Sequence, residues 1–372
     1  MDVGFYGNVR QYHNLKQEID AAILEVLESG GYVMGPTLAR FEKELADFWG
    51  TKHAIGCNSG TDALWLAFLA LGIGPGDEVI TVANTFFATA EAIWVVGAGT
   101  RFVEIEPKTC NMDVTQIEGA ITGRTKAIVP VHLYGQLVDM PAVAEIARKH
   151  DLLVIEDAAQ AVDAAGPDFR SGELSDAVCT SFIIQKNLGT FGDSGAVMTN
   201  RDDMVDRIHA LRNHGSIKRS YHSMGYNSRL DDLHAGILSV KLKQVPAWSD
   251  RRREIAAQYD EALQDLDWIK LPYQVPGYRH VYHLYVIEVD DRDEMLQYLN
   301  DHGVDAKTHY PIAIHRQEGY PWGKDAEPDP SLPLSEQSAA RVISLPMFPE
   351  LTQGEIDYVI ETVRAWKGEV HR

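Results

Sequence analysis

The chain has 372 residues with 34 basic and 54 acidic side chains, and its formal net charge is −20 with histidine neutral. This length accommodates about two domains, and 45 % hydrophobic with 24 % charged residues excludes a mainly disordered or fibrous protein. The negative charge argues against nucleic acid or an anionic membrane as the main partner, and no apolar run reaches the about 20 residues of a membrane span.

The start of the chain shows no secretory signal. Its three cysteines, Cys57, Cys110 and Cys179, are too few for a disulfide framework, and their spacing fits no zinc site. We therefore expect a cytoplasmic protein with no metal.

Helical and strand-like segments alternate between about residues 50 and 200. Helices are predicted at residues 41–49, 61–71, 87–96 and 141–149, and strands at 78–82, 100–105, 126–131, 152–155 and 177–184. Most of these strands are continuous apolar runs, which favours an α/β fold with a mostly parallel sheet covered by helices on both faces.

The pattern changes after residue 200. Helices are predicted at residues 202–212, 230–243, 249–266, 293–302 and 353–367, with one strand at 281–289. We expect a large domain over residues 1–250 and a smaller C-terminal α+β domain over residues 251–372, connected by the long helix.

Three segments carry residues suited to chemistry. The first, Asn-Ser-Gly-Thr-Asp at residues 58–62, precedes a buried helix whose free N–H groups would suit a phosphate, although an ordinary helix cap fits equally well. The second is an apolar strand ending in Glu156 and Asp157, where a carboxylate can hold a cofactor nitrogen in its protonated form. The alternative is a solvated acidic turn.

The third segment is a strand that runs into a glycine-rich loop with Lys186 at the junction. A lysine that is partly removed from water has a lowered pKa and a nucleophilic amine, although most lysines are simply exposed. The helix start at residues 58–62, here called the phosphate cup, is followed along the chain by Asp157 at one strand end and by Lys186 at the next. This order matches the requirements of a pyridoxal phosphate (PLP) site.

The sequence resembles the DegT/StrS family of PLP-dependent sugar aminotransferases, which have the fold type I of aspartate aminotransferase. The resemblance covers nearly the whole chain. It rests on ordered segments, among them residues 29–32 (SGGY), 58–64 (NSGTDAL), 76–80 (GDEVI), 156–161 (EDAAQA), 186–189 (KNLG), 225–231 (GYNSRLD), 309–311 (HYP) and 344–346 (SLP).

The resemblance implies a role for each matching residue. Lys186 would form the Schiff base and carry the proton, and Asp157 would pair with the pyridine nitrogen. The cofactor ring would be contacted by Phe86, with Phe87 as the fallback, and by Gln160. The phosphate would be bound by Gly60, Thr61 and Ser181, and by Asn227 from the second subunit of a homodimer. The substrate would be bound by Tyr32, Arg229, His309 and Tyr310.

The chain departs from the family pattern beside the site. Val162-Asp163 replaces the usual His-Gly, Ile184-Gln185 replaces the usual Pro and small residue, and His234 replaces a usual Gln. Because these positions border the cofactor or sugar pocket, they place the usual substrate in question but leave the Schiff base intact.

The function implied is transfer of an amino group from glutamate or glutamine to a keto-sugar by a ping-pong mechanism. Residues 227–231 (NSRLD) are more similar to the branch that uses nucleotide-linked 3-keto-deoxysugars. The alternatives are a non-nucleotide keto-sugar or keto-cyclitol acceptor, a PLP-dependent dehydratase or epimerase, and a non-catalytic regulator with the same fold.

Overall fold

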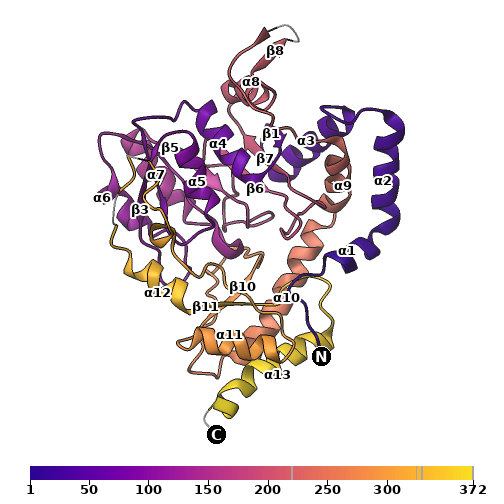
Figure 1. Ribbon diagram of the computed structural model, residues 1–372, viewed down its shortest axis with the longest axis vertical. Coiled ribbons are helices and arrows are strands. Elements are labelled where there is room, and N and C mark those ends of the chain that lie inside the picture. The colour runs from indigo at the N-terminus through magenta and orange to yellow at the C-terminus, as the bar shows by residue number, and fades with distance from the viewer. Residues whose placement is uncertain (219–220, 324, 328–329, 371–372) are drawn as a thin grey trace.

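The computed structural model describes residues 1–218, 221–323, 325–327 and 330–370 (Figure 1). Within these residues, seven strands form a central sheet in the order β1-β7-β6-β5-β4-β2-β3. Neighbours from β2 to β6 are parallel, whereas β7 is antiparallel to both β1 and β6. The strands are His53–Cys57 (β1), Glu78–Val82 (β2), Gly99–Val103 (β3), Thr125–Ile128 (β4), Leu153–Asp157 (β5), Ala177–Ser181 (β6) and Gly195–Thr199 (β7).

Successive strand residues pack on opposite faces of this sheet, so both faces are covered and the strands read as continuous apolar runs. Val79 and Ile155 face the layer of α4 (Gly60–Ala70), α5 (Ala88–Val95) and α8 (Asp202–Leu211). Ile80 and Val154 face the layer of α3 (Pro36–Trp49), α7 (Met140–His150) and α9 (Asp232–Leu242). Each fully buried aliphatic side chain of this kind contributes about 1.5–3 kcal/mol. The fold is therefore the helix-covered, mostly parallel sheet predicted from the sequence.

A second core lies in the C-terminal part of the chain, below the sheet in Figure 1. It is built from α10 (Val245–Leu263), α11 (Arg292–Asp301), α13 (Gln353–Val370) and the antiparallel pair β10 (Tyr285–Glu288) and β11 (Val342–Leu345). Val3 joins this core and forms a bridge with Val304. Because α10 runs through residue 250, the division of the chain at that residue stays a prediction.

Some predicted boundaries were wrong. The strand predicted at residues 177–184 ends at Ser181, where the chain leaves the sheet, and the strand predicted at 281–289 is confined to Tyr285–Glu288. The prediction did not include several short or solvent-facing elements: α1 (Asn8–Asn14), α2 (Lys16–Ser29), α6 (Ile117–Ala120), α12 (Pro333–Arg341), the strands β7 and β11, and the hairpin of β8 (Ser216–Lys218) and β9 (Tyr221–His222). Of the helices in the described ranges, none has both the length and the apolar surface needed to cross a bilayer.

Candidate active site

Lys186 lies in the turn that connects β6 to β7. The backbone N–H of Thr190 donates to the carbonyl of Phe182 (2.8 Å) and closes the turn, while the Lys186 N–H donates to the Ile183 carbonyl (2.9 Å). Burial lowers the pKa of Lys186 to about 8, although the nearby Asp157 carboxylate opposes that shift. A substantial share of this amine is therefore neutral near pH 8, as a nucleophile requires.

Asp157 ends β5, the strand beside β6, so it lies at the same sheet edge as the Lys186 turn. Its side chain is buried, and its Oδ2 accepts from the Thr89 hydroxyl at 2.8 Å. Thr89 is in turn 3.1 Å from the hydroxyl of Thr85, and Oδ1 accepts from the Ala159 N–H at 3.2 Å. These bonds fix a carboxylate in an orientation suited to a protonated ring nitrogen.

Gln160 connects two aromatic residues at this edge. Its Oε1 accepts from the Tyr134 backbone N–H (2.7 Å), and its Nε2 donates to the Tyr310 hydroxyl (3.2 Å). The Tyr310 ring lies 5.7 Å from the Phe86 ring, whereas Phe87 packs at 4.6 Å on Trp322. The geometry thus brings Phe86, and not Phe87, to the Gln160 group.

Two histidines face Lys186 in their neutral form. Burial, with the Lys186 charge adding to it, lowers the pKa of His309 to about 4, and His309 Nδ1 lies 2.8 Å from the Ser344 hydroxyl. Burial and the same lysine hold the pKa of His283 well below its usual value. His283 Nδ1 lies 3.2 Å from Asn187 Oδ1, so it contacts the residue next to the lysine.

The expected phosphate cup lies where α4 approaches the end of β6. Ser59 caps the helix by accepting from the Asp62 N–H at 3.0 Å. A Cβ on Gly60 would lie only 2.6 Å from Ser181 Cβ, so a glycine is required for this approach. Gly60, Thr61 and Ser181 thereby surround a helix N-terminus with N–H and hydroxyl groups, a cradle that fits the phosphate of the cofactor.

In the single chain, Asn227 and Arg229 flank Ser228, whose hydroxyl donates to Asp62 Oδ2 (2.5 Å) in the first turn of α4, whereas the Tyr32 carbonyl accepts from the Asp232 N–H (3.0 Å) at the start of α9. Among the described residues, the Tyr32 hydroxyl donates to the Leu27 carbonyl (3.0 Å) and Arg229 Nη1 donates to Asn213 Oδ1 (2.8 Å). Asn227 is exposed, at the base of the β8–β9 hairpin that projects at the top of Figure 1. Their roles therefore stay predictions.

The departures from the family pattern have local explanations. Val162 is buried in the main core, and Asp163 has a φ of 72° at the position where the family has glycine. Asp163 Oδ2 accepts from Arg279 Nη2 (2.7 Å), which compensates part of the backbone strain. Ile184 and Gln185 lie half-buried in the Lys186 turn.

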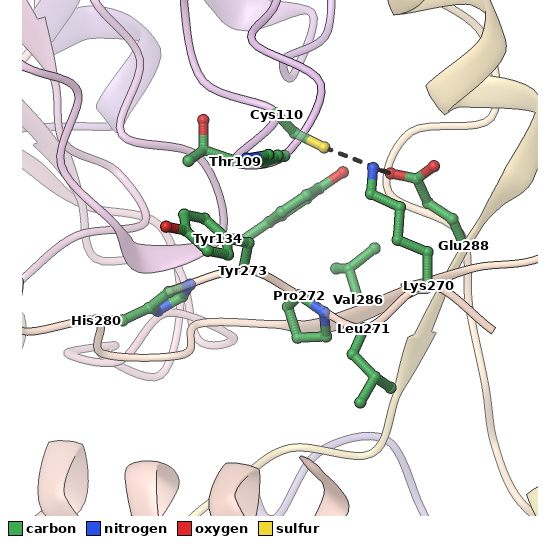
Figure 2. Close-up of a pocket in the computed structure, with 11 residues that line it drawn as sticks. Thr109, Cys110, Tyr134, Lys270, Leu271, Pro272, Tyr273, His280, Val286 and Glu288 are labelled. Carbon is green, nitrogen blue, oxygen red and sulfur yellow. Dashed lines mark hydrogen bonds and ion pairs between the residues drawn. The ribbon is translucent and has the colours of Figure 1, made fainter. Parts of the chain in front are cut away.

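Tyr134 also borders a separate small cavity of about 20 Å³ (Figure 2). In Figure 2, Lys270 and Glu288 point toward each other with Cys110 beside them, and the Lys270 Nζ to Glu288 Oε1 distance is 2.6 Å. This volume suits about one water molecule. Because the Tyr134 hydroxyl donates to the His309 carbonyl (2.5 Å), Tyr134 also contacts the site residues.

Four site residues were missed by the sequence reading. Tyr134 follows the strand beside β5, so the strand-end argument applied to Asp157 would have found it. Asn187 lies in the quoted segment 186–189 (KNLG) but was given no role, whereas Thr89 and His283 carried no comparable local signal because their contacts depend on how distant segments pack.

A family model described as the "DegT/DnrJ/EryC1/StrS aminotransferase family" matches residues 13–364. A "dTDP-3-amino-3,4,6-trideoxy-alpha-D-glucose transaminase" of Streptomyces venezuelae is 43 % identical over 360 residues, covering 96 % of this chain and 94 % of that protein. A "Pleiotropic regulatory protein" of Geobacillus stearothermophilus is also 43 % identical, covering 98 % of both chains. The crystal structure of S. venezuelae DesV in complex with a ketimine intermediate superposes with a TM-score of 0.95 at 42 % identity, covering 98 % of both chains.

Proposed function

This chain belongs to the DegT/DnrJ/EryC1/StrS aminotransferase family, and we propose that it moves the amino group of glutamate or glutamine to a nucleotide-linked 3-keto-deoxysugar. It is a sugar aminotransferase with pyridoxal phosphate as its cofactor. The observation that carries the proposal is the position of the half-buried Lys186, which follows β6 at the sheet edge where Asp157 ends the neighbouring strand β5.

When bound, pyridoxal phosphate supplies an electron sink that stabilises negative charge on the substrate carbon. Gly60, Thr61 and Ser181 would hold its phosphate at the N-terminus of α4. The Asp157 carboxylate, oriented by Thr89, would keep the ring nitrogen protonated.

Lys186 would transfer the proton during each of the two half-reactions. Its amine can serve this purpose because a pKa of about 8 lets Nζ both accept and release a proton near neutral pH. His283 and His309 stay neutral beside it, so they add no positive charge that would lower its basicity further.

We propose that the site is completed in a homodimer. Asn227 is exposed in the segment that follows the β8–β9 hairpin, and the preceding Tyr221 and Met224 are 71 % and 81 % exposed. We propose that these two side chains belong to an apolar patch that contacts the second subunit, because exposed apolar side chains that gather in a patch mark such surfaces. There, Asn227 would reach the partner's phosphate, and Arg229 would bind the donor carboxylate through its planar fork.

The S. venezuelae relative, named for a dTDP-linked 3-amino sugar, supports the choice of acceptor. The test is incubation of the purified protein with ¹⁵N-labelled glutamate, or glutamine labelled at its α-amino group, and one acceptor at a time. The acceptors are a dTDP-3-keto-deoxysugar, its nucleotide-free form and a keto-cyclitol, and Lys186→Ala is the control.

We expect ¹⁵N in the nucleotide-linked product only, and none with Lys186→Ala. Equal turnover of the nucleotide-free sugar would refute the nucleotide requirement. Loss of oxygen without uptake of nitrogen would refute transamination and indicate a dehydratase.

A further inference from the structure

A buried lysine, Lys241, lies against the turn that carries Lys186. Lys241 belongs to α9, and none of its surface is exposed. Removing an ammonium group from water is unfavourable unless other groups compensate for the lost hydration. The contacts of Lys241 therefore indicate what this residue does.

These contacts are concentrated on the β6–β7 turn. Lys241 Nζ donates to the Gly189 carbonyl at 2.5 Å and lies 4.5 Å from the centroid of the Phe191 ring. Burial lowers the pKa of Lys241 to about 8, and the Glu350 carboxylate opposes the shift. The ammonium thus binds a carbonyl only three residues beyond Lys186.

The turn has little room to adjust around this contact. A Cβ on Gly189 would lie 2.7 Å from the carbonyl oxygens of both Ile183 and Ile184. Lys186 itself donates its N–H to the Ile183 carbonyl. A displacement of Gly189 would therefore move the same backbone that sets the direction of the Lys186 side chain.

A buried arginine, Arg252, holds a segment that contacts the turn. Arg252 Nη1 donates to the carbonyls of Met347 (2.6 Å) and Tyr282 (3.1 Å). The segment it holds contains His283, which contacts Asn187. Glu350 opposes the lowering of the pKa of Arg252 as it does for Lys241, so one carboxylate compensates both cations.

We propose that Lys241 is a positioning residue that holds the Lys186 turn in its reactive geometry through the Gly189 carbonyl. The proposal rests on the role proposed for Lys186. In it, Lys241 touches neither substrate nor cofactor and acts only through the turn.

The test uses the holoenzyme with Lys241→Met, which keeps the length of the side chain but removes its donor. Lys243→Met is the matched control, because Lys243 is exposed two residues further along. In Lys241→Met we expect amide hydrogen exchange in residues 183–192 to be at least about fivefold faster than in the control, since a buried carbonyl loses its partner. We also expect the pH midpoint of the visible cofactor absorbance to shift and kcat to fall more than KM rises.

Exchange rates and an absorbance midpoint equal to those of Lys243→Met would overturn the proposal. If Lys241→Met does not fold, the test uses Lys241→Gln, whose side chain is one bond shorter than that of lysine and reaches Gly189 less well. The same changes in hydrogen exchange and absorbance are then expected, at smaller size. The absence of these changes in Lys241→Gln would also overturn the proposal. Hydrogen exchange does not depend on turnover. A protein without transaminase activity would refute the proposed function and leave this comparison valid.

Discussion

Gly60→Ala tests the phosphate cup directly. The added Cβ would lie 2.6 Å from Ser181 Cβ, 3.1 Å from its Cα and 3.2 Å from its Oγ, whereas ordinary contacts begin at 3.4 Å. Ser181 cannot retreat easily, because β6 is paired with β5 on one side and with β7 on the other. The N-terminus of α4 must therefore move away from the cup.

Overpacking of this kind costs about 1–3 kcal/mol. If that cost falls on cofactor binding, the affinity for pyridoxal phosphate decreases about fivefold to 150-fold. The assay is titration of the cofactor-free protein with pyridoxal phosphate, followed by absorbance. Gly354→Ala is the control, because a Cβ at this position in α13 meets nothing within 4 Å.

A second substitution separates the clash from other effects. Ser181→Gly removes two of the three atoms that the new Cβ would meet, Cβ and Oγ, so the double variant should recover most of the thermal stability lost by cofactor-free Gly60→Ala. An affinity and a Tm for Gly60→Ala equal to those of Gly354→Ala would refute the reasoning.

Three further predictions follow from the contacts of the site. Thr89→Val leaves Asp157 Oδ2 without its donor, which costs about 1–3 kcal/mol, so kcat/KM should fall about fivefold to 150-fold, and unchanged steady-state kinetics would contradict this role. Asp163→Ala loses the Arg279 ion pair and keeps the positive φ, so chemical denaturation should show a loss of about 1–2 kcal/mol. Asp163→Gly relieves the backbone strain, so its free energy of unfolding should stay near that of the unchanged protein. Equal losses of stability in Asp163→Ala and Asp163→Gly would exclude backbone strain as the cause. The pKa of His309 is lowered from 6.5 to about 4, so its neutral form stabilises the fold above pH 6.5 and this contribution is lost as the pH falls toward 4. Urea unfolding should show that the free energy of unfolding of His309→Gln declines less steeply between pH 6.5 and 4 than that of the unchanged protein. An equal decline in both proteins would rule out His309 as a source of the pH dependence.

The site residues that could be predicted from the residues alone are those whose signal lies in the neighbouring sequence. Asp157 is the last residue of strand β5, and Lys186 follows strand β6, so the argument from strand ends located both. His309 and Tyr310 were identified only through the family resemblance, because they lie more than 100 residues from the lysine.

The missed features depend on contacts between distant segments. Thr89 orients Asp157 from 68 residues away, and Lys241 reaches Gly189 from 52 residues away. Lys241 begins the sequence Lys-Leu-Lys, and no sequence pattern distinguishes the buried Lys241 from the exposed Lys243. Strand β7 (Gly195–Thr199) was missed because it begins with a glycine directly after a glycine-rich turn, so its start carried no strand signal.

The antiparallel strand β7 also has a consequence for biosynthesis. The end of β1 leads into the N-terminus of α4, yet β1 is an edge strand that pairs in the sheet with β7, residue Cys57 opposite Gly195. A ribosome adding about 5–20 residues per second needs roughly 7–28 s to synthesise the intervening stretch. During that interval β1 has an unpaired edge, so the nascent chain is exposed to aggregation and cannot retain cofactor before β7 emerges.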